Sequence, residues 1–505
     1  MDAAPEPIAD ASPPSPEPAR RLTLELALAP EDARRLPLLL RGNGRQRAVP
    51  VTFVWHDTPG FDLAAEGVAL VERQQGRRTS WRLERMGTES GTPCPVLAEA
   101  ADATALGAAL PAQLAAVAGF AGRARNLLAP DGVELAMLAG TLGAAGAARA
   151  CCRVVLAGPE AAVATLAERL AGRLHLHVPA ASLAAEAMAV AGRAAPSRSR
   201  AAPALPPDRP VGETFAHLVG QLTAAILQEA ERVSPTECEP VHQMRVALRR
   251  LRSAFGLFSR AVRCPELASC NDALRNLGRV LGPARDWDVF VAQTGRTVAA
   301  SFAEDPAVRR LLDAAEQRRQ DAYVALLHHL GGAEFRRLGI ALAVLVATRP
   351  WEAMLAAALR TDGDAEAARQ AERLARPLAG FAARALERRM RPLREPGANI
   401  EALPAEALHR LRLHGKRLRY ACEFFAPLFP GRGARRFIRR LTVLQERLGH
   451  LNDGSVAAGL MAELGAAHAT AGGVVRGFVA ARALGARARI GQSWRKFHRL
   501  DPFWD

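Results

Sequence analysis

Four basic side chains recur at helical spacing within Val241–Arg260. His242, Arg245, Arg249 and Arg252 stand at positions i, i+3, i+7 and i+10, so on a helix they share one arc of roughly 80°. An arginine fork binds phosphate oxygens through paired hydrogen bonds, and an imidazole can donate another. Apolar residues occupy a separate arc of the same segment. The pattern therefore predicts a helix with one face in a core and the other able to bind an anion.

The same pattern returns later in the chain, within Leu408–Phe425. The equivalent positions are occupied by His409, Arg412, Lys416 and Arg419. Each lies as far along the chain from its counterpart as His409 lies from His242, and we call this separation the repeat offset. Matching features also follow each copy at this offset, and these are Leu281-Gly282 and Arg285-Asp286 in the first copy and Leu448-Gly449 and Asn452-Asp453 in the second. Because chance would have to preserve both spacing and residue type, an internal duplication is indicated. Asp286 and Asp453 are interpreted as turn or cap residues.

A basic helical face has two interpretations, a solvated surface or a ligand-binding surface. We call each row of four basic residues, from His242 to Arg252 and from His409 to Arg419, a stripe. No acid shares the arc of either stripe, and uncompensated like charges destabilise a helix unless a ligand neutralises them. The duplication and this absence favour one anion bound by both stripes, together with neighbouring cations. The predicted binding residues are His242, Arg245, Arg249, Arg250, Arg252, His409, Arg412, Lys416, Arg417, Arg419 and Arg439.

The two stripe histidines could donate to an anion, bind a metal or only pack. No carboxylate or cysteine accompanies either one at ligand spacing, which argues against a metal site. A protonated imidazole is the stronger phosphate donor, so binding should tighten below about pH 6.5, the ordinary histidine pKa. An affinity that stays flat between about pH 5.5 and pH 8 would assign them to packing.

The repeated pattern HxxRxxxRRLR and HxxRxxxKRLRY, with LG(x)2[RN]D downstream and a closing WRKFHRLDPFW, closely resembles the CHAD family of α-helical domains. The resemblance covers the chain from about Pro210 to its end. It implies two pseudo-symmetric helical bundles whose basic helices share a surface that binds inorganic polyphosphate. Independently of the family, the two stripes of one duplicated unit are expected to converge on one polyanion.

Charge is distributed unevenly along this 505-residue chain, whose net charge is +16. Residues 1–210 carry 22 arginines and no lysine against 21 acids, a net charge of +1, and the other +15 belongs to the helical half. A polyanionic partner is therefore expected for that half. The length indicates two or more domains. Seven scattered cysteines without a CxxC pair favour free thiols in a reducing compartment.

The N-terminal half predicts strands, which alternate and are separated by Gly and Pro turns. They are Arg21–Leu28, Val49–Trp55, Val68–Arg73 and Ser80–Met86. The run VTFVWHDTPGFDLAAEGVALVER, with strands on both sides, resembles the CYTH family of triphosphate tunnel enzymes over about Arg20–Gly192. That resemblance implies a β-barrel in which acids hold divalent metal and basic residues hold a triphosphate.

Departures from the CYTH pattern argue against catalysis. The family's Glu-x-Glu-x-Lys opening reads Thr23, Glu25 and Ala27, and Arg149–Leu156 adds no acid where a later strand should supply some. Ser182–Met188 contains Glu186 but not the family's lysine. Residual tunnel residues are expected to be Glu25, Arg73, Arg82 and Arg85. Because one carboxylate cannot hold Mg²⁺ or Mn²⁺ against a triphosphate, we expect no enzyme activity, no metal and no cofactor.

The predicted fold class is α+β with two domains, an antiparallel β tunnel with flanking helices and an all-α domain of two bundles. The predicted divisions are a disordered tail (1–19), the tunnel domain (20–193), a linker (194–210) and the helical domain (211–505). Leu106, Leu110, Leu114 and Val117 predict helices within Ala98–Ala150, and GTLGAAGAA at Gly140 predicts a turn. The helices predicted beyond the linker are Gly212–Val233, the two basic helices, Asn271–Leu281, Ala307–His329, Glu334–Thr348 and Ala365–Arg391.

Function is predicted to be binding of inorganic polyphosphate, in the cytoplasm and at polyphosphate granules. The N-terminus lacks the basic and apolar regions of a signal peptide, and no apolar run is long enough to span a membrane. Two alternatives remain, a triphosphatase acting on tripolyphosphate or a nucleoside triphosphate, and a nucleic-acid-binding protein. The N-terminal domain could also contact protein partners, and the sequence leaves the oligomeric state open.

Overall fold

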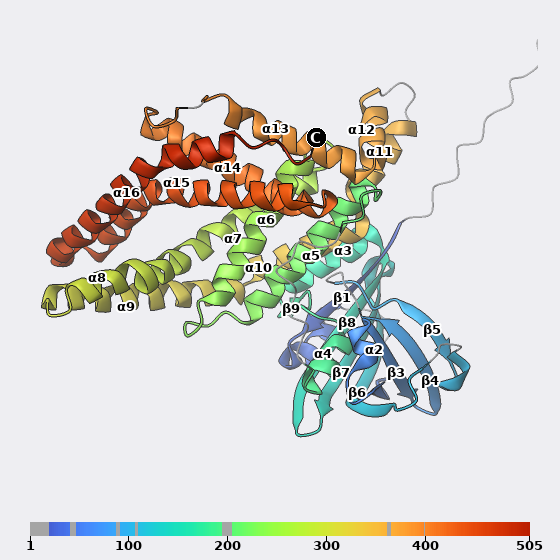
Figure 1. Cartoon of the computed structure of the whole chain (residues 1–505). Helices are drawn as coiled ribbons and strands as arrows, with labels where there is room; N and C mark the ends of the chain where they lie inside the picture. Colours follow the sequence, from blue (N-terminus) through green and yellow to red (C-terminus); the bar gives the residue numbers. More distant parts are fainter. Residues whose placement is uncertain are drawn as a thin grey trace, which may run out of the picture.

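The computed structural model describes residues 20–40, 47–86, 91–106, 110–193, 205–360, 365–397 and 399–504. The predicted tail and residues 194–204 of the predicted linker lie outside these ranges. A β-sheet with short helices forms the N-terminal part, and helices form the rest (Figure 1). The α+β fold class with two structural parts is therefore confirmed.

The described strands of the N-terminal part form one antiparallel sheet in the order β5-β4-β3-β2-β6-β7-β8-β1-β9. They are β1 (Arg21–Leu28), β2 (Val49–Asp57), β3 (Val68–Gln75), β4 (Arg78–Arg85), β5 (Val96–Ala100), β6 (Ala115–Leu128), β7 (Glu134–Ala144), β8 (Ala147–Pro159) and β9 (Leu176–His177). Four short helices accompany them, α1 (Leu36–Leu40), α2 (Asp62–Ala65), α3 (Glu160–Ala171) and α4 (Leu183–Val190). The leucines of β1 are buried on one face, which leaves Glu25 on the other.

The prediction of helices within Ala98–Ala150 is wrong for the residues that the structure describes there, which form strands and two short 3₁₀ helices. Strands β6 and β7 occupy much of the segment, and Gly122 of β6 pairs with Gly140 of β7. A Cβ atom at Gly122 would lie 2.4 Å from the carbonyl oxygen of Ala139, and one at Gly140 would lie 2.3 Å from that of Ala121. The small residues therefore allow two strands to approach closely. The turn predicted in the run GTLGAAGAA, which begins at Gly140, is confirmed at residues 145–146, between β7 and β8.

Helices fill the chain after the linker. They are α5 (Val211–Glu231), α6 (Glu239–Phe258), α7 (Pro265–Val289), α8 (Arg296–Ser301), α9 (Pro306–Leu330), α10 (Ala333–Thr348), α11 (Pro350–Arg360), α12 (Ala365–Ala375), α13 (Leu378–Arg394), α14 (Ala405–Phe425), α15 (Arg432–Leu464) and α16 (Ala469–His498). The helix predicted over Ala365–Arg391 is divided at Pro377, because proline disfavours helical geometry in the residue before it. Helix α7 is longer at both ends than the predicted Asn271–Leu281.

The duplication is visible in the backbone as a pseudo-twofold relation. Helices α5 and α13 begin at Val211 and Leu378, which are separated by the repeat offset. The amide of Val211 donates to the carbonyl of Arg376 at 3.2 Å, and the amide of Leu378 donates to the carbonyl of Arg209 at 3.1 Å. The donors of these two bonds, and likewise their acceptors, are related by the same offset. The two repeats therefore meet through reciprocal contacts at the start of their first helices.

Side-chain packing repeats as well, with large and small residues exchanged. In the first repeat, Leu248 of α6 approaches Gly278 of α7, where an added Cβ atom would lie 3.4 Å from the leucine Cδ2. In the second repeat, the equivalent positions are Gly415 of α14 and Gln445 of α15. A Cβ atom at Gly415 would lie 1.9 Å from the Gln445 Nε2. Each helix pair thus keeps one glycine at this close contact, but on opposite partners.

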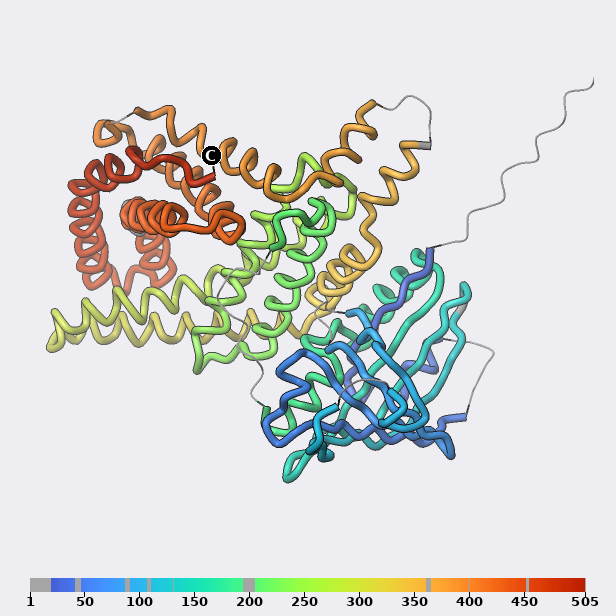
Figure 2. The backbone as a smooth tube through the Cα atoms, turned by 45° about the vertical axis from the view of Figure 1, so that its right-hand side comes forward, coloured from blue at the N-terminus to red at the C-terminus, as the bar shows by residue number. Residues whose placement is uncertain are grey.

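The sheet and the helical part are packed together through α3 and α10. One continuous apolar core contains Leu24 of β1, Val154 of β8 and Leu338 of α10. The Nε of Arg336 donates to the carbonyl of Ala171 at 3.1 Å. Figure 1 and Figure 2 both place the second repeat away from the sheet and α10 beside it.

No single described helix is both long and apolar enough to cross a membrane, whereas α10 and α11 together pass that test as a pair bent by 43°.

Candidate anion-binding groove

Helices α6 and α14 carry the two cationic stripes, and burial of their apolar faces fixes which way the stripes point. Met244 and Leu251 of α6 are fully buried, as is Leu418 of α14. The two helices approach each other at their C-terminal ends, where the rings of Phe258 and Phe425 lie 6.3 Å apart. These phenylalanines are also separated by the repeat offset, so the stripes are related by the same pseudo-symmetry as the repeats.

A groove of about 910 Å³ opens beside these helices. Four of the predicted cations line it, Arg249, Arg252, Lys416 and Arg417. Arg389 of α13 also lines it and donates to the carbonyl of Gly256 at 3.0 Å. Sequence reasoning missed Arg389, because it lies on a helix with many arginines and no spacing distinguishes it. Arg263 and Tyr420 also line the groove.

Cations from both stripes lie close enough to Lys416 to lower the pKa of its ammonium group. Burial, together with the arginines around it, lowers the pKa of the Lys416 ammonium to about 8. Arg412 and Arg419 are on its own helix, whereas Arg245 and Arg249 belong to α6. The structure thus brings five of the predicted residues into one cationic centre, which we call the Lys416 centre.

The Lys416 centre contains buried donors without a hydrogen-bond acceptor. Arg245 Nη1, Arg249 Nε, Arg412 Nε and Arg419 Nε are all buried, and the described structure provides no acceptor for any of them. An unpaired buried donor is unfavourable by about 1–3 kcal/mol. Arg249 lines the groove, whereas Arg245, Arg412 and Arg419 are outside its lining. An anionic oxygen beside Arg249 could accept from its donor, and the charged bond would be stronger than a neutral one.

Two acidic residues that do not belong to the stripes lie near the predicted anion-binding residues. Glu423 accepts from Arg419 at 2.8 Å and from Arg250 at 3.5 Å, so Arg250 is an ion-pair partner at the edge of the site. Asp286 lies near Arg245, and burial raises the pKa of its carboxyl more than the nearby arginines lower it. The prediction that Asp286 and Asp453 are caps is wrong, because they lie inside α7 and α15.

Of the remaining predicted residues, His242, His409 and Arg439 lie away from the groove and Arg252 lines it. His242 is half-buried and His409 is exposed, and neither lines the groove. Arg439 is exposed on α15 and also lies outside it. Arg252 lines the groove and donates from Nε to Asn271 Oδ1 at 3.4 Å. The groove thus meets the stripes at Arg249, Arg252 and Lys416, whereas the two histidines lie at the N-terminal ends of the helices.

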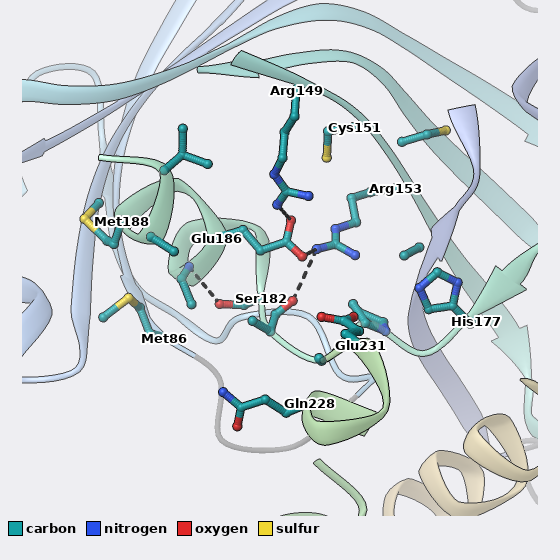
Figure 3. Close-up of a pocket in the computed structure, with 18 of the residues that line it drawn as sticks. Met86, Arg149, Cys151, Arg153, His177, Ser182, Glu186, Met188, Gln228 and Glu231 are labelled. Carbon is teal, nitrogen blue, oxygen red and sulfur yellow. Dashed lines mark hydrogen bonds and ion pairs between the residues drawn. The ribbon is translucent and has the colours of Figure 1, made fainter. Parts of the chain in front are cut away.

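The interior of the sheet contains a second group of charged residues. Glu186 of α4 lies between Arg149 and Arg153 of β8, with a separation of 2.5 Å to each (Figure 3). Arg153 is only 3% exposed, and its Nε is also 3.7 Å from Glu25. Burial raises the pKa of the Glu25 carboxyl, against the opposing effect of Arg153. Glu25 therefore already faces an arginine.

A cavity of about 850 Å³ adjoins this cluster and extends to the helical part. Arg149, Arg153 and Glu186 line one side, and Gln228 and Glu231 of α5 line another (Figure 3). Because α5 is the first helix of the duplicated domain, the sheet and the helices share this cavity.

The other predicted tunnel cations divide between the two faces of the sheet. Arg73 lies 4.5 Å from the ring centre of Phe53 inside the sheet, and Arg82 Nε lies 3.1 Å from Glu99. Glu84, which sequence reasoning missed, faces the same side as Arg82, and burial raises its pKa. Arg85 points to the opposite face because side chains alternate along β4. The prediction that Arg85 faces the tunnel is therefore wrong.

Apolar side chains occupy much of the sheet interior. Phe53, Trp55, Phe120 and Leu142 form one buried cluster with Met188 of α4. Among the residues that the structure describes, no group of three or more His, Cys, Asp or Glu side chains is placed to hold a metal ion. The interior thus combines an aromatic core with a few ion pairs.

Comparison with known proteins identifies the helical part. Residues 216–462 match the model of the CHAD domain. The chain therefore carries a CHAD domain, which contains both cationic stripes and the groove between them. A solved CHAD domain from the plant Ricinus communis is 28% identical, with a TM-score of 0.44, and covers 59% of this chain and 96% of that chain.

Two uncharacterized proteins of Mycobacterium tuberculosis resemble a larger share of the chain. Each is 28% identical over 438 residues, which is 80% of this chain and 80% of the relative. A putative adenylyl cyclase from Hippeastrum, described as having a dominant triphosphatase activity, is similar over 30% of this chain and 86% of its own. It is 16% identical with a TM-score of 0.24.

Proposed function

We propose that this protein binds inorganic polyphosphate in the groove beside α6 and α14, and that this binding brings it to polyphosphate granules in the cytoplasm. The Lys416 centre carries the proposal, because five cations from two helices surround one position there. Like charges held this close are unfavourable without a counter-charge. A chain of phosphates supplies repeated negative charge along a line, which fits a row of cations better than one small anion does.

The CHAD domain supports polyphosphate over other polyanions, since this family is linked to polyphosphate. The aromatic residues near the stripes also argue against nucleic acid. Phe258, Phe424 and Phe425 are buried in the core, and of the two aromatic residues that line the groove, Phe255 is only 9% exposed and Tyr420 is half-buried. Proteins that bind single strands without sequence preference usually stack bases on exposed aromatic rings.

We propose further that the sheet domain does not hydrolyse triphosphates. Metal-assisted hydrolysis needs clustered carboxylates that hold the ion. Glu25 and Glu186 both face Arg153, so their charges are partly compensated within the protein. The aromatic interior around Phe53 and Phe120 also leaves little polar surface for a triphosphate. The domain would instead contact protein partners or position the CHAD domain.

Competition between ligands tests the binding proposal. Labelled polyphosphate bound to the full chain should be displaced by unlabelled long-chain polyphosphate at far lower phosphate concentration than by RNA, at one fixed salt concentration. Equal displacement by both polymers would favour a general polyanion-binding protein instead. In cells, the labelled protein should be concentrated at granules, and a diffuse distribution in the presence of granules would contradict that part of the proposal.

A further inference from the structure

A second cluster of arginines lies outside the groove, around the start of α13. It surrounds a cavity of about 420 Å³, which we call the α13 pocket. The arginines that line it come from the loop between α6 and α7, from the C-terminal end of α12 and the residue that follows it, and from α13, and they are Arg260, Arg263, Arg373, Arg376, Arg384 and Arg388. None of these belongs to the two stripes, and the sequence pattern does not single them out.

Only part of this charge is neutralised by neighbouring acids. Arg373 lies 3.1 Å from Glu366, and Arg376 lies 2.6 Å from Glu372. The structure, over the ranges that it describes, shows no acidic partner for the other four arginines, which are Arg260, Arg263, Arg384 and Arg388. Burial lowers the pKa of Arg388, and nearby Arg260, Arg389 and Arg384 lower it further. An uncompensated positive pocket of this kind resembles the Lys416 centre in its electrostatics.

The α13 pocket adjoins the groove. Arg263 lines both cavities. Arg388 lines the pocket while its neighbour in the chain, Arg389, lines the groove. The pKa of Arg389 is lowered by burial and by Arg417 on α14. Cations therefore follow one another from the Lys416 centre, past Arg417 and Arg389, to the α13 pocket.

The pocket is not a by-product of the duplication. By the repeat offset, the counterparts of Arg384 and Arg388 in the first repeat are His217 and Gln221, whose side chains lie 2.9 Å apart and hydrogen-bond with each other. The counterparts of Arg260 and Arg263 in the second repeat are Pro427 and Pro430. Each of the four arginines thus has no cation of fixed charge at the equivalent position of the other repeat. The symmetric architecture alone would not produce this pocket.

We propose that the α13 pocket is a second phosphate-binding subsite, and that one polyphosphate chain occupies the groove and this pocket together. The inference depends on the proposed function, and it adds a preference for chains long enough to reach both. Short chains would fill the groove alone. Long chains would also reach Arg260, Arg263, Arg384 and Arg388 without a second entropic cost of association.

The test compares R384E/R388E with the native protein, using polyphosphate of ~10 phosphates and long-chain polyphosphate at 150 mM salt. At that salt the screening length is about 8 Å, so long-range repulsion is limited. The matched control is R309E/R310E, which makes the same charge change at exposed arginines of α9. R260Q, at a residue that lines the pocket but not the groove, tests the pocket from a different element, in case glutamates in α13 impair folding. Circular dichroism verifies the fold of each variant.

Both pocket variants should weaken binding of the long chain by more than tenfold and leave binding of the short chain within about twofold. The slope of log affinity against log salt for the long chain should also fall, by about 0.7–0.9 for each phosphate that the variant no longer binds. Equal effects on short and long chains, or effects no larger than those of R309E/R310E, would overturn the subsite. If the native protein binds neither chain, the proposed function itself fails, which is a different result from an absent chain-length preference.

Discussion

Lys416 provides the sharpest prediction, because its charge should depend on pH in the range where polyphosphate binding is easily measured. With a pKa of about 8 in the free protein, this ammonium is about 90% protonated at pH 7 and about 10% at pH 9. Bound phosphates favour the charged form and raise the pKa again. If only the protonated form binds well, affinity should fall about tenfold between pH 7 and pH 9. Near pH 8 each binding event should take up about half a proton.

The substitution K416R separates this effect from other causes. Arginine keeps its charge throughout the range, so the variant should bind with nearly constant affinity from pH 7 to pH 9. At pH 8 it should bind about twofold more tightly than the native protein, since about half of the native lysine is neutral there. Isothermal titration calorimetry in two buffers of different ionisation enthalpy measures the proton uptake, which K416R should abolish. An identical pH profile and proton uptake in both proteins would refute the proposed role of Lys416.

The same pKa predicts how the free protein responds to pH. Between the folded value of about 8 and the ordinary value of 10.5, the unfolded chain binds the proton and the folded protein has released it. Stability of the ligand-free protein should therefore rise with pH across this window. Thermal unfolding should show this rise for the native protein and not for K416R.

Three further predictions concern the acid at the groove, salt and the sheet domain. E423Q frees Arg419 and Arg250 from their shared carboxylate and should tighten polyphosphate binding by about two- to fivefold, whereas E406Q, an exposed control on α14, should not change it. With ~6–10 phosphate contacts, affinity in a fluorescence assay should fall ~10³–10⁵-fold between 50 and 200 mM salt, and a weak dependence would argue against the cationic groove. The full chain with Mg²⁺ or Mn²⁺ should release no phosphate from tripolyphosphate, and release that E25A removes would contradict the proposal.

Periodicity was sufficient to predict the elements that carry the stripes. The duplicated spacing of His242 and His409 gave the two basic helices, and alternation gave β1 and its buried leucines. Periodicity failed to predict the secondary structure of Ala98–Ala150, because a segment rich in Gly and Ala is compatible with several structures. There the deciding interaction is the close pairing of Gly122 with Gly140 across two strands, which no local pattern encodes.

The composition of the groove could be predicted only in part. Lys416 and Arg249 were identified because their spacing is repeated, whereas Glu423 and Asp286 became relevant only once separate helices were packed together. Arg389 was missed for the same reason. Spacing also could not separate the residues at the centre of the groove from those at its ends. Exposure and electrostatic neighbours depend on tertiary packing, which a helical arc does not specify.

The central claim is that cations of α6 and α14 hold one polyphosphate chain, and charge reversal tests it most directly. The variant R245E/R249E/R412E/K416E reverses the Lys416 centre, and its control reverses four exposed arginines of α9 and α16 that lie outside the groove and the α13 pocket: Arg309, Arg310, Arg476 and Arg482. Circular dichroism should show the same helical content in both variants. The groove variant should lose detectable polyphosphate binding while the control binds within about tenfold of the native protein, since screening limits the effect of distant charges. Equal affinities of the two variants would contradict the account.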